Sequence, residues 1–132
     1  MKLISILPLL KSDLLELILS CCDENLENSI LEWEDKKSIC VVLCSKGYPE
    51  KFENNIQIKD LEQINLLENQ NIFHAGTFKT KTGIVSNGGR VLNFVSTSDD
   101  FSKCRDEAIN LIKKLNWENG YFRGDIGHKV IK

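Results

Sequence analysis

Apolar residues recur at helical spacing near the amino end of the chain. Four of them fall one to four positions apart along one side of a helix: Leu14, Leu15, Ile18 and Leu19. This spacing predicts a helix over 13–22, and Asp13 with Glu16 is typical of a helix start. The apolar stretch 3–10, which is broken at Pro8, is instead expected to be the end of a strand that enters a loop.

A second helical pattern lies near the carboxyl end. Its apolar residues form one stripe: Phe101, Cys104, Ala108, Leu111, Ile112 and Leu115. Thr97, Ser98 and Asp99 supply the start signal, because their side-chain oxygens can accept from the free N–H groups of a first helical turn. We therefore expect a helix over 98–115.

The region between these helices has the pattern of strands. Residues 39–44 are apolar and rich in β-branched side chains, which indicates a strand buried on both faces. Ile30 and Trp33, followed by the charged run 34–37, suggest that this strand is the second half of a hairpin.

Three further strands are expected, at residues 72–78, 83–86 and 90–96, with turn signals at 81–83 and 87–89. Between 50 and 71 the chain is polar and offers only short elements. Together these elements predict an α+β fold, in which a small, mostly antiparallel sheet is closed by the helix over 98–115.

Size and charge narrow the possible functions. The chain has 132 residues, which is enough for one domain with a core of its own. It carries 17 basic and 19 acidic residues, a formal net charge of −2. Because no overall field attracts it to polyanions, we expect neither nucleic acid nor a membrane as a partner.

The cysteines do not indicate a disulfide framework or a metal site. There are five of them, with no CxxC pair: Cys21, Cys22, Cys40, Cys44 and Cys104. Only two histidines could complete a metal cage. We expect reduced cysteines that act as small apolar residues, and no bound metal.

The amino-terminal sequence imitates a secretion signal but contains charges that a signal core excludes. Lys11, Asp13 and Glu16 interrupt the apolar run, which is also far shorter than the roughly 20 residues of a membrane span. We therefore expect a cytoplasmic protein.

The double glycine in "NGGRV" has two possible meanings. Gly88 and Gly89 can form an ordinary hairpin turn, and spacing alone favours this. Alternatively, the two glycines let backbone N–H groups approach an anion, to which Arg90 adds a positive charge.

The segment "YFRGDIGH" carries the densest group of chemically useful residues. Arg123 has a planar fork of donors suited to phosphate or carboxylate. His128 can donate or accept a proton near neutral pH, and Gly124 and Gly127 allow a sharp turn. Its Arg-Gly-Asp tripeptide does not indicate an adhesion ligand, since that role belongs to extracellular proteins.

Several stretches together resemble one family, glycinamide ribonucleotide synthetase, also called phosphoribosylamine–glycine ligase. They are "LPLLKSDLLELI", "LEWEDKKSICVVLCSKGYP", "IFHAGT", "GIVSNGGRVL" and "YFRGDIGH". They follow the family's order and spacing from about Ser5 to the end of the chain. The ordered set is specific, although each stretch alone is weak.

The resemblance implies the carboxyl-terminal part of an ATP-grasp ligase of purine biosynthesis. The complete enzyme joins glycine to 5-phosphoribosylamine, with ATP and magnesium. Residues 1–27 would be a remnant of the ATP-grasp core, and 28–132 the carboxyl-terminal domain. The nucleotide and magnesium sites would lie in the missing amino-terminal part, so this chain alone would hold no catalytic residue, bind no cofactor and be inactive.

The resemblance also implies a site for the ribose phosphate of the substrate. Related enzymes hold this phosphate with a basic turn where "RGDIGH" stands, which makes Arg123 and His128 candidates, together with Arg90 and the amides of Gly88 and Gly89. The family usually has a second basic residue at the position of Gly124. The alternative interpretation is a non-catalytic remnant, or a module that binds phosphate or a partner protein.

Overall fold

The computed structural model describes residues 2–131. Its α-helices are α1 (Lys2–Ile6), α2 (Leu14–Cys22) and α3 (Phe101–Leu115). Its strands are β1 (Lys37–Ser45), β2 (Gln70–His74), β3 (Thr77–Thr80), β4 (Gly83–Ser86), β5 (Arg90–Ser98) and β6 (Gly120–Tyr121). Short 3-10 turns occur at Leu7–Leu9, Leu26–Asn28 and Leu61–Gln63.

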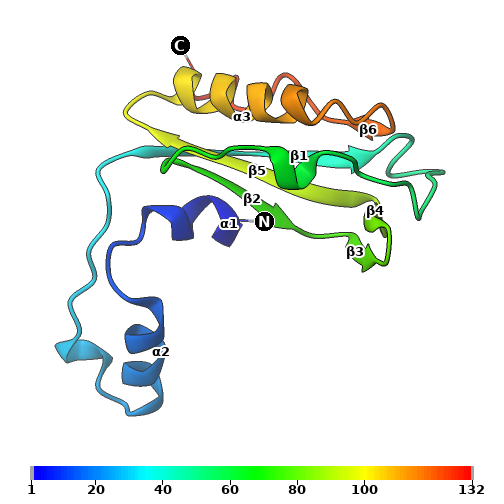
Figure 1. Cartoon of the computed structure of the whole chain (residues 1–132). Coiled ribbons are helices and arrows are strands. Elements are labelled where there is room, and N and C mark those ends of the chain that lie inside the picture. The colour runs from blue at the N-terminus through cyan, green and yellow to red at the C-terminus, as the bar shows by residue number, and fades with distance from the viewer. Residues whose placement is uncertain (1, 132) are drawn as a thin grey trace.

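The main sheet has four antiparallel strands in the order β2-β5-β1-β6, and β3 and β4 form a separate two-stranded sheet. Helix α3 covers one face of the main sheet, and α1 lies against the other (Figure 1). The expected α+β fold, with an antiparallel sheet and one packed helix, is confirmed.

The core lies between α3 and the sheet. Its fully buried members come from both layers: Val41, Leu43, Leu92, Phe94, Cys104, Ala108 and Leu111. Burial alternates along β1, which corrects the expectation of a strand buried on both faces. Cys40 and Cys44 point away from α3 and are only half-buried, and this burial raises the pKa of both thiols.

Helix α3 begins later than the start signal suggested. Asp100 is its N-cap, and the Asp100 carboxylate accepts from the N–H of Lys103 at 3.0 Å. Thr97 and Ser98 cannot cap the helix because both are paired within β5. Strand pairing with β1 therefore outweighs the helix-start preference of these two residues.

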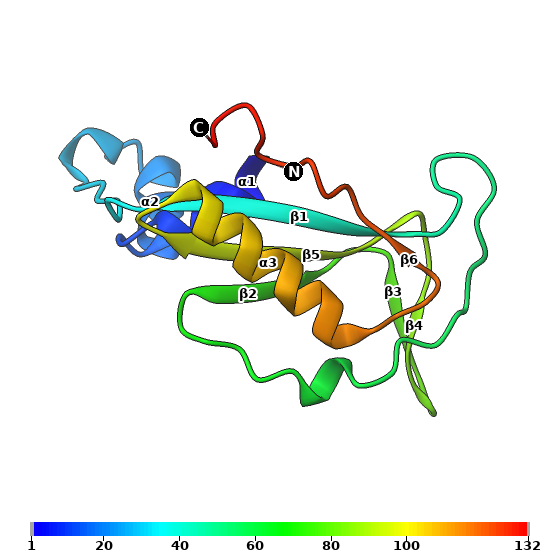
Figure 2. The same ribbon diagram turned by 90° about the horizontal axis from the view of Figure 1, so that it is seen from above.

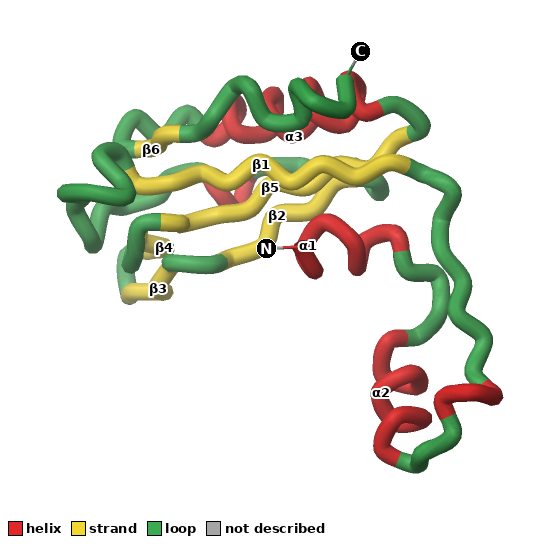
Figure 3. The backbone as a smooth tube through the Cα atoms, turned by 180° about the vertical axis from the view of Figure 1, so that it is seen from behind, coloured by secondary structure: helices red, strands yellow, loops and turns green. Residues whose placement is uncertain are grey.

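Helix α2 and the segments on either side of it form an arm that stands away from the sheet (Figure 3). Helix α2 agrees with the expected helix, and the Asp13 carboxylate accepts from the N–H groups of Leu15 and Glu16. The expected strand at 3–10 is wrong, since this stretch is helical. The expected hairpin is also wrong, because Trp33 pairs with Leu10 instead of with β1.

Strand β5 contains an irregularity that determines where one cation points. The ladder between β1 and β5 shifts by one residue after Leu43, so that Cys44 pairs with Arg90. Paired residues share a face of an antiparallel sheet. The shift therefore brings Arg90 onto the face of Cys44, away from α3.

The carboxyl-terminal segment runs back beside β1 (Figure 2). Gly127 lies so close to Ile39 that an added Cβ would be 2.9 Å from the Ile39 Cδ1 atom. Ile126 and Ile131 also pack against the core. No helix within residues 2–131 is long and apolar enough to cross a membrane.

Candidate functional site

The double glycine does not form a hairpin turn. The interpretation that its spacing in the sequence favoured is therefore wrong. Residues 87–89 connect β4 of the small sheet to β5 of the main sheet, and these two strands are not paired. Gly88 has φ of +144°, a conformation that side chains other than glycine rarely adopt. The two glycines therefore serve a crossing between sheets.

A cavity of about 480 Å³ opens beside this crossing, on the sheet face opposite α3. It is lined by Ile4, Tyr48, Ala75, Gly76, Gly89, Arg90 and Asn93. Its size is within the range of small-ligand sites, about 300–1,000 Å³. Arg90 is the only charged residue among these, so the cavity favours an anion.

The backbone of the crossing has N–H groups that are available to a ligand. Within residues 2–131, the N–H groups of Gly88 and Gly89 donate no hydrogen bond to the protein. Asn87, by contrast, donates its N–H to the carbonyl of Gly76 at 2.8 Å. Two unused N–H groups next to an arginine form the kind of arrangement that binds phosphate.

Three neighbours hold the crossing in place. The N–H and the Oγ of Ser45 donate to the carbonyls of Gly89 and Gly88, at 2.8 and 2.9 Å. The ring of Tyr48 lies against Gly89, and an added Cβ at Gly89 would be 1.9 Å from the Tyr48 ring. Gly76 is also closely packed, since an added Cβ would be 2.7 Å from the Arg90 carbonyl oxygen.

Replacing Gly89 with alanine is expected to displace Tyr48 and to destabilise the fold by about 1–3 kcal/mol, the usual cost of overpacking. Chemical denaturation measures the cost, and loss of the nuclear Overhauser contact between Tyr48 and Phe52 reports the displacement. Their ring centroids are 5.9 Å apart. Gly124→Ala is the matched control, because its Cβ meets nothing within 4 Å. Equal stability for both variants would contradict the close packing.

The structure places Arg123 and His128 in a different turn. The Arg123 guanidinium donates two hydrogen bonds to the Asp125 carboxylate, at 2.9 and 2.6 Å. Arg123, Asp125 and His128 are all exposed. This pairing lowers the pKa of Asp125 and raises the pKa of Arg123. The His128 Nδ1 lies 2.9 Å from the Asp125 backbone carbonyl.

The two turns lie along different parts of β1: the crossing lies beside Cys44, whereas Gly127 of the terminal turn lies against Ile39. Cys44 pairs with Arg90 on one side and with Tyr121 on the other, which sets the backbones of Arg90 and Tyr121 about 10 Å apart. Phe122, which follows β6, packs against the core under α3. Within residues 2–131, no hydrogen bond joins Arg123 or His128 to Arg90.

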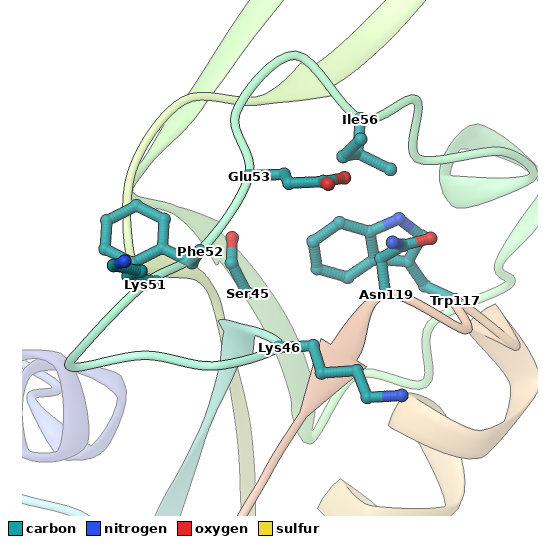
Figure 4. Close-up of a pocket in the computed structure, with 8 residues that line it drawn as sticks. All are labelled: Ser45, Lys46, Lys51, Phe52, Glu53, Ile56, Trp117 and Asn119. Atoms are coloured by element: carbon teal, nitrogen blue, oxygen red, sulfur yellow. The ribbon is translucent and has the colours of Figure 1, made fainter.

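A second pocket, of about 380 Å³, lies behind the crossing (Figure 4). It is lined by Ser45, Lys46, Lys51, Phe52, Glu53, Ile56, Trp117 and Asn119. Ser45 thus faces this pocket, while Gly89 and Arg90 face the first cavity. Among the described residues, no group of three or more histidine, cysteine or acidic side chains could hold a metal ion.

Sequence reasoning missed Ser45, Tyr48, Gly76 and Asn93 as site residues. Ser45 and Tyr48 belong to the stretch "SKGY", which in the sequence indicates only that a strand ends there. Asn93 is 2% exposed, a burial that would have been difficult to infer for an amide from periodicity alone. Only the fold brings Tyr48, Gly76 and Asn93 to the Arg90 cavity and places Ser45 in the pocket behind it.

Known proteins resemble this chain in both sequence and structure. A family model described as phosphoribosylglycinamide synthetase, C domain, matches residues 38–129. A phosphoribosylamine–glycine ligase of Caldanaerobacter subterraneus is 41% identical over 122 residues, which are 92% of this chain and 28% of that protein. The corresponding ligase of Fusobacterium nucleatum is 40% identical over 93% of this chain and 29% of its own length.

The structural comparison agrees. The crystal structure of the phosphoribosylamine–glycine ligase from Thermotoga maritima matches with a TM-score of 0.61 and 28% identity. The match covers 82% of this chain and 27% of that one. This chain therefore spans less than a third of the length of these relatives.

Proposed function

Because the chain belongs to the family of the phosphoribosylglycinamide synthetase C domain, we propose that it serves as that domain of a ligase that joins glycine to 5-phosphoribosylamine. The reaction would consume ATP and require magnesium as a cofactor, as the family resemblance implies. The observation that carries the proposal is the cavity lined by Arg90 and Gly89, beside the unused N–H groups of Gly88 and Gly89.

The cavity is suited to the phosphate of the ribose substrate. Arg90 supplies a bidentate, permanently charged donor, and the two glycine amides add neutral donors from the backbone. Arg123, two residues after the partner of Cys44, would approach the same ligand from the other side of β1. His128 would have to reach it from beyond Gly127, which lies against Ile39. For this, Arg123 has to exchange the Asp125 carboxylate for the phosphate, which is feasible because the pair is exposed to water.

The arm would connect this chain to the rest of the ligase. We assign residues 1–27 to the ATP-grasp core and 28–132 to the C domain. Helix α2 has no buried residue, and Leu15, Ile18 and Leu19 are each more than half exposed. An apolar helix face of this kind usually packs against another surface, and the nucleotide-binding part of the ligase is the proposed partner. That part would supply the catalytic and magnesium-binding residues.

Reconstitution tests this assignment. The chain is mixed with the Fusobacterium nucleatum ligase produced without the stretch that aligns with it, and glycine ligation is measured with ATP, magnesium and 5-phosphoribosylamine. We expect no ligation by either part alone and measurable ligation by the mixture. A stable complex that does not ligate glycine would contradict the proposal.

Gly124→Lys provides a graded test of the terminal turn. The position is exposed and its Cβ meets no neighbour, so a lysine side chain fits without disturbing the fold. A further charged hydrogen bond to the phosphate is worth about 1.5–3 kcal/mol, and we expect the Michaelis constant for 5-phosphoribosylamine to fall by at least tenfold in the reconstituted ligase. Gly124→Gln, similar in length but neutral, is the control. No change with lysine would remove this turn from the phosphate site.

A second candidate function is a binding module without catalysis, and the exposed apolar face of α2 favours it. Such a module would bind ribose 5-phosphate or a partner protein but would not restore ligation. The reconstitution experiment therefore separates the two candidates.

A further inference from the structure

We propose that Ser45 is a positioning residue for the anion site: it holds the carbonyls of Gly88 and Gly89 so that the Gly89 N–H stays directed into the Arg90 cavity. The inference rests on the proposed phosphate site. It adds a residue to which the sequence and the family resemblance gave no role.

Two donors of Ser45 act on two successive peptide groups. Its backbone N–H donates to the Gly89 carbonyl at 2.8 Å, and its Oγ donates to the Gly88 carbonyl at 2.9 Å. Ser45 is 3% exposed and sits at the end of β1, which anchors it in the sheet. Both bonds therefore start from a fixed point.

Fixing a carbonyl also fixes the N–H of the same peptide group. The peptide is planar and trans, so the Gly89 N–H points opposite to the Gly88 carbonyl. Since that carbonyl points to Ser45, the Gly89 N–H points away from Ser45. Ser45 lines the pocket behind the crossing (Figure 4). Gly89 lines the Arg90 cavity, which is a separate cavity.

The crossing needs such a restraint because it consists of glycines. A Gly-Gly peptide can rotate between several orientations of similar energy, and only one of them presents its N–H to the cavity. Holding that orientation before the ligand arrives lowers the ordering cost of binding. Tyr48, whose ring lies on Gly89, limits the remaining freedom of the crossing.

Strand β1 contains a matched control. Ser38 lies in the same strand, and its Oγ is also buried but has no hydrogen-bond partner. Ser38→Ala removes a hydroxyl from β1 without removing a restraint on the crossing. Ser45→Thr keeps the hydroxyl and adds a methyl group for which the pocket beside Ser45 has room.

The experiment uses the full chain, labelled with ¹⁵N, and inorganic phosphate as the probe. Two quantities are measured for the wild type, Ser45→Ala, Ser45→Thr and Ser38→Ala: the dissociation constant of phosphate from the amide shifts of Gly88 and Gly89, and the residual dipolar coupling of the Gly89 N–H without phosphate. For Ser45→Ala we expect a three- to tenfold weaker binding, as the loss of one hydrogen bond predicts, and a dipolar coupling reduced by averaging. Ser45→Thr and Ser38→Ala should resemble the wild type.

The dipolar coupling keeps this inference separate from the proposed function. If the wild type does not bind phosphate but Ser45→Ala still averages the Gly89 coupling, the restraint by Ser45 stands and the phosphate site is wrong. If Ser45→Ala keeps the wild-type coupling, the restraint is wrong whether or not phosphate binds. An equal loss of binding in Ser38→Ala would likewise overturn it.

Discussion

Replacing Phe94 with alanine is expected to lower the free energy of unfolding by about 3–5 kcal/mol, the usual cost of removing a buried phenylalanine. Phe94 is 0% exposed and sits at the centre of β5, opposite Val41 and next to Ile72. The ring contacts the layer under α3, and the cavity left behind cannot be refilled from the rigid sheet. Since domains of this size are stable by only about 5–15 kcal/mol, much of the variant would lose its fold near physiological temperature.

Urea denaturation followed by circular dichroism measures this loss. Phe78→Ala is the matched control, because Phe78 is 60% exposed in the small sheet and its removal is expected to cost less than about 1 kcal/mol. Similar midpoints for the two variants would show that the packing between α3 and β5 is not the main source of stability.

Replacing Arg90 with alanine is expected to weaken phosphate binding by about 10–100-fold, the equivalent of one charged hydrogen-bonding group. Arg90 is exposed and its side chain belongs to no ion pair within residues 2–131. Its removal should therefore leave the fold intact. Arg90→Lys keeps the charge but loses the bidentate fork, so we expect an intermediate affinity.

Binding of ribose 5-phosphate, measured by calorimetry, tests this expectation. Lys114→Ala is the control for net charge, since Lys114 is exposed on α3 and that helix covers the opposite face of the sheet. If both variants bind equally well, the attraction is a general charge effect and the cavity is not the site.

Elements whose residues follow one regular period were predicted well. The apolar stripe of α3 and the short repeat of α2 gave helices close to their observed bounds, and 83–86 coincides with β4. These patterns survive because each element buries the same face along its whole length. The family resemblance was equally dependable, since it used several stretches in order and not a single motif.

The errors have one physical cause, which is that partners distant in sequence decide local structure. Trp33 has a strand-like neighbourhood but pairs with Leu10 in the arm. The Asn-Gly-Gly signal is typical of a hairpin, yet β4 and β5 belong to different sheets. Sequence placed Gly88, Gly89 and Arg90 together as candidates, but Tyr48 and Asn93 joined them only through the fold. The roles of Arg123 and His128 stay predictions.

The one-residue shift in the ladder after Leu43 has a consequence for anyone who edits this region. Side chains alternate between the two faces along a regular strand. Because of the shift, the β5 residues before it lie on the opposite face from the one that this alternation would give them. Deleting Val91 would make the ladder regular and leave the arginine opposite Cys44, away from α3. A variant that straightens β5 with every residue in place would instead pair Arg90 with Ser45 and turn the arginine toward α3. The letters "GGR" would still be present in such a variant, but the cation would emerge on the wrong side of the sheet.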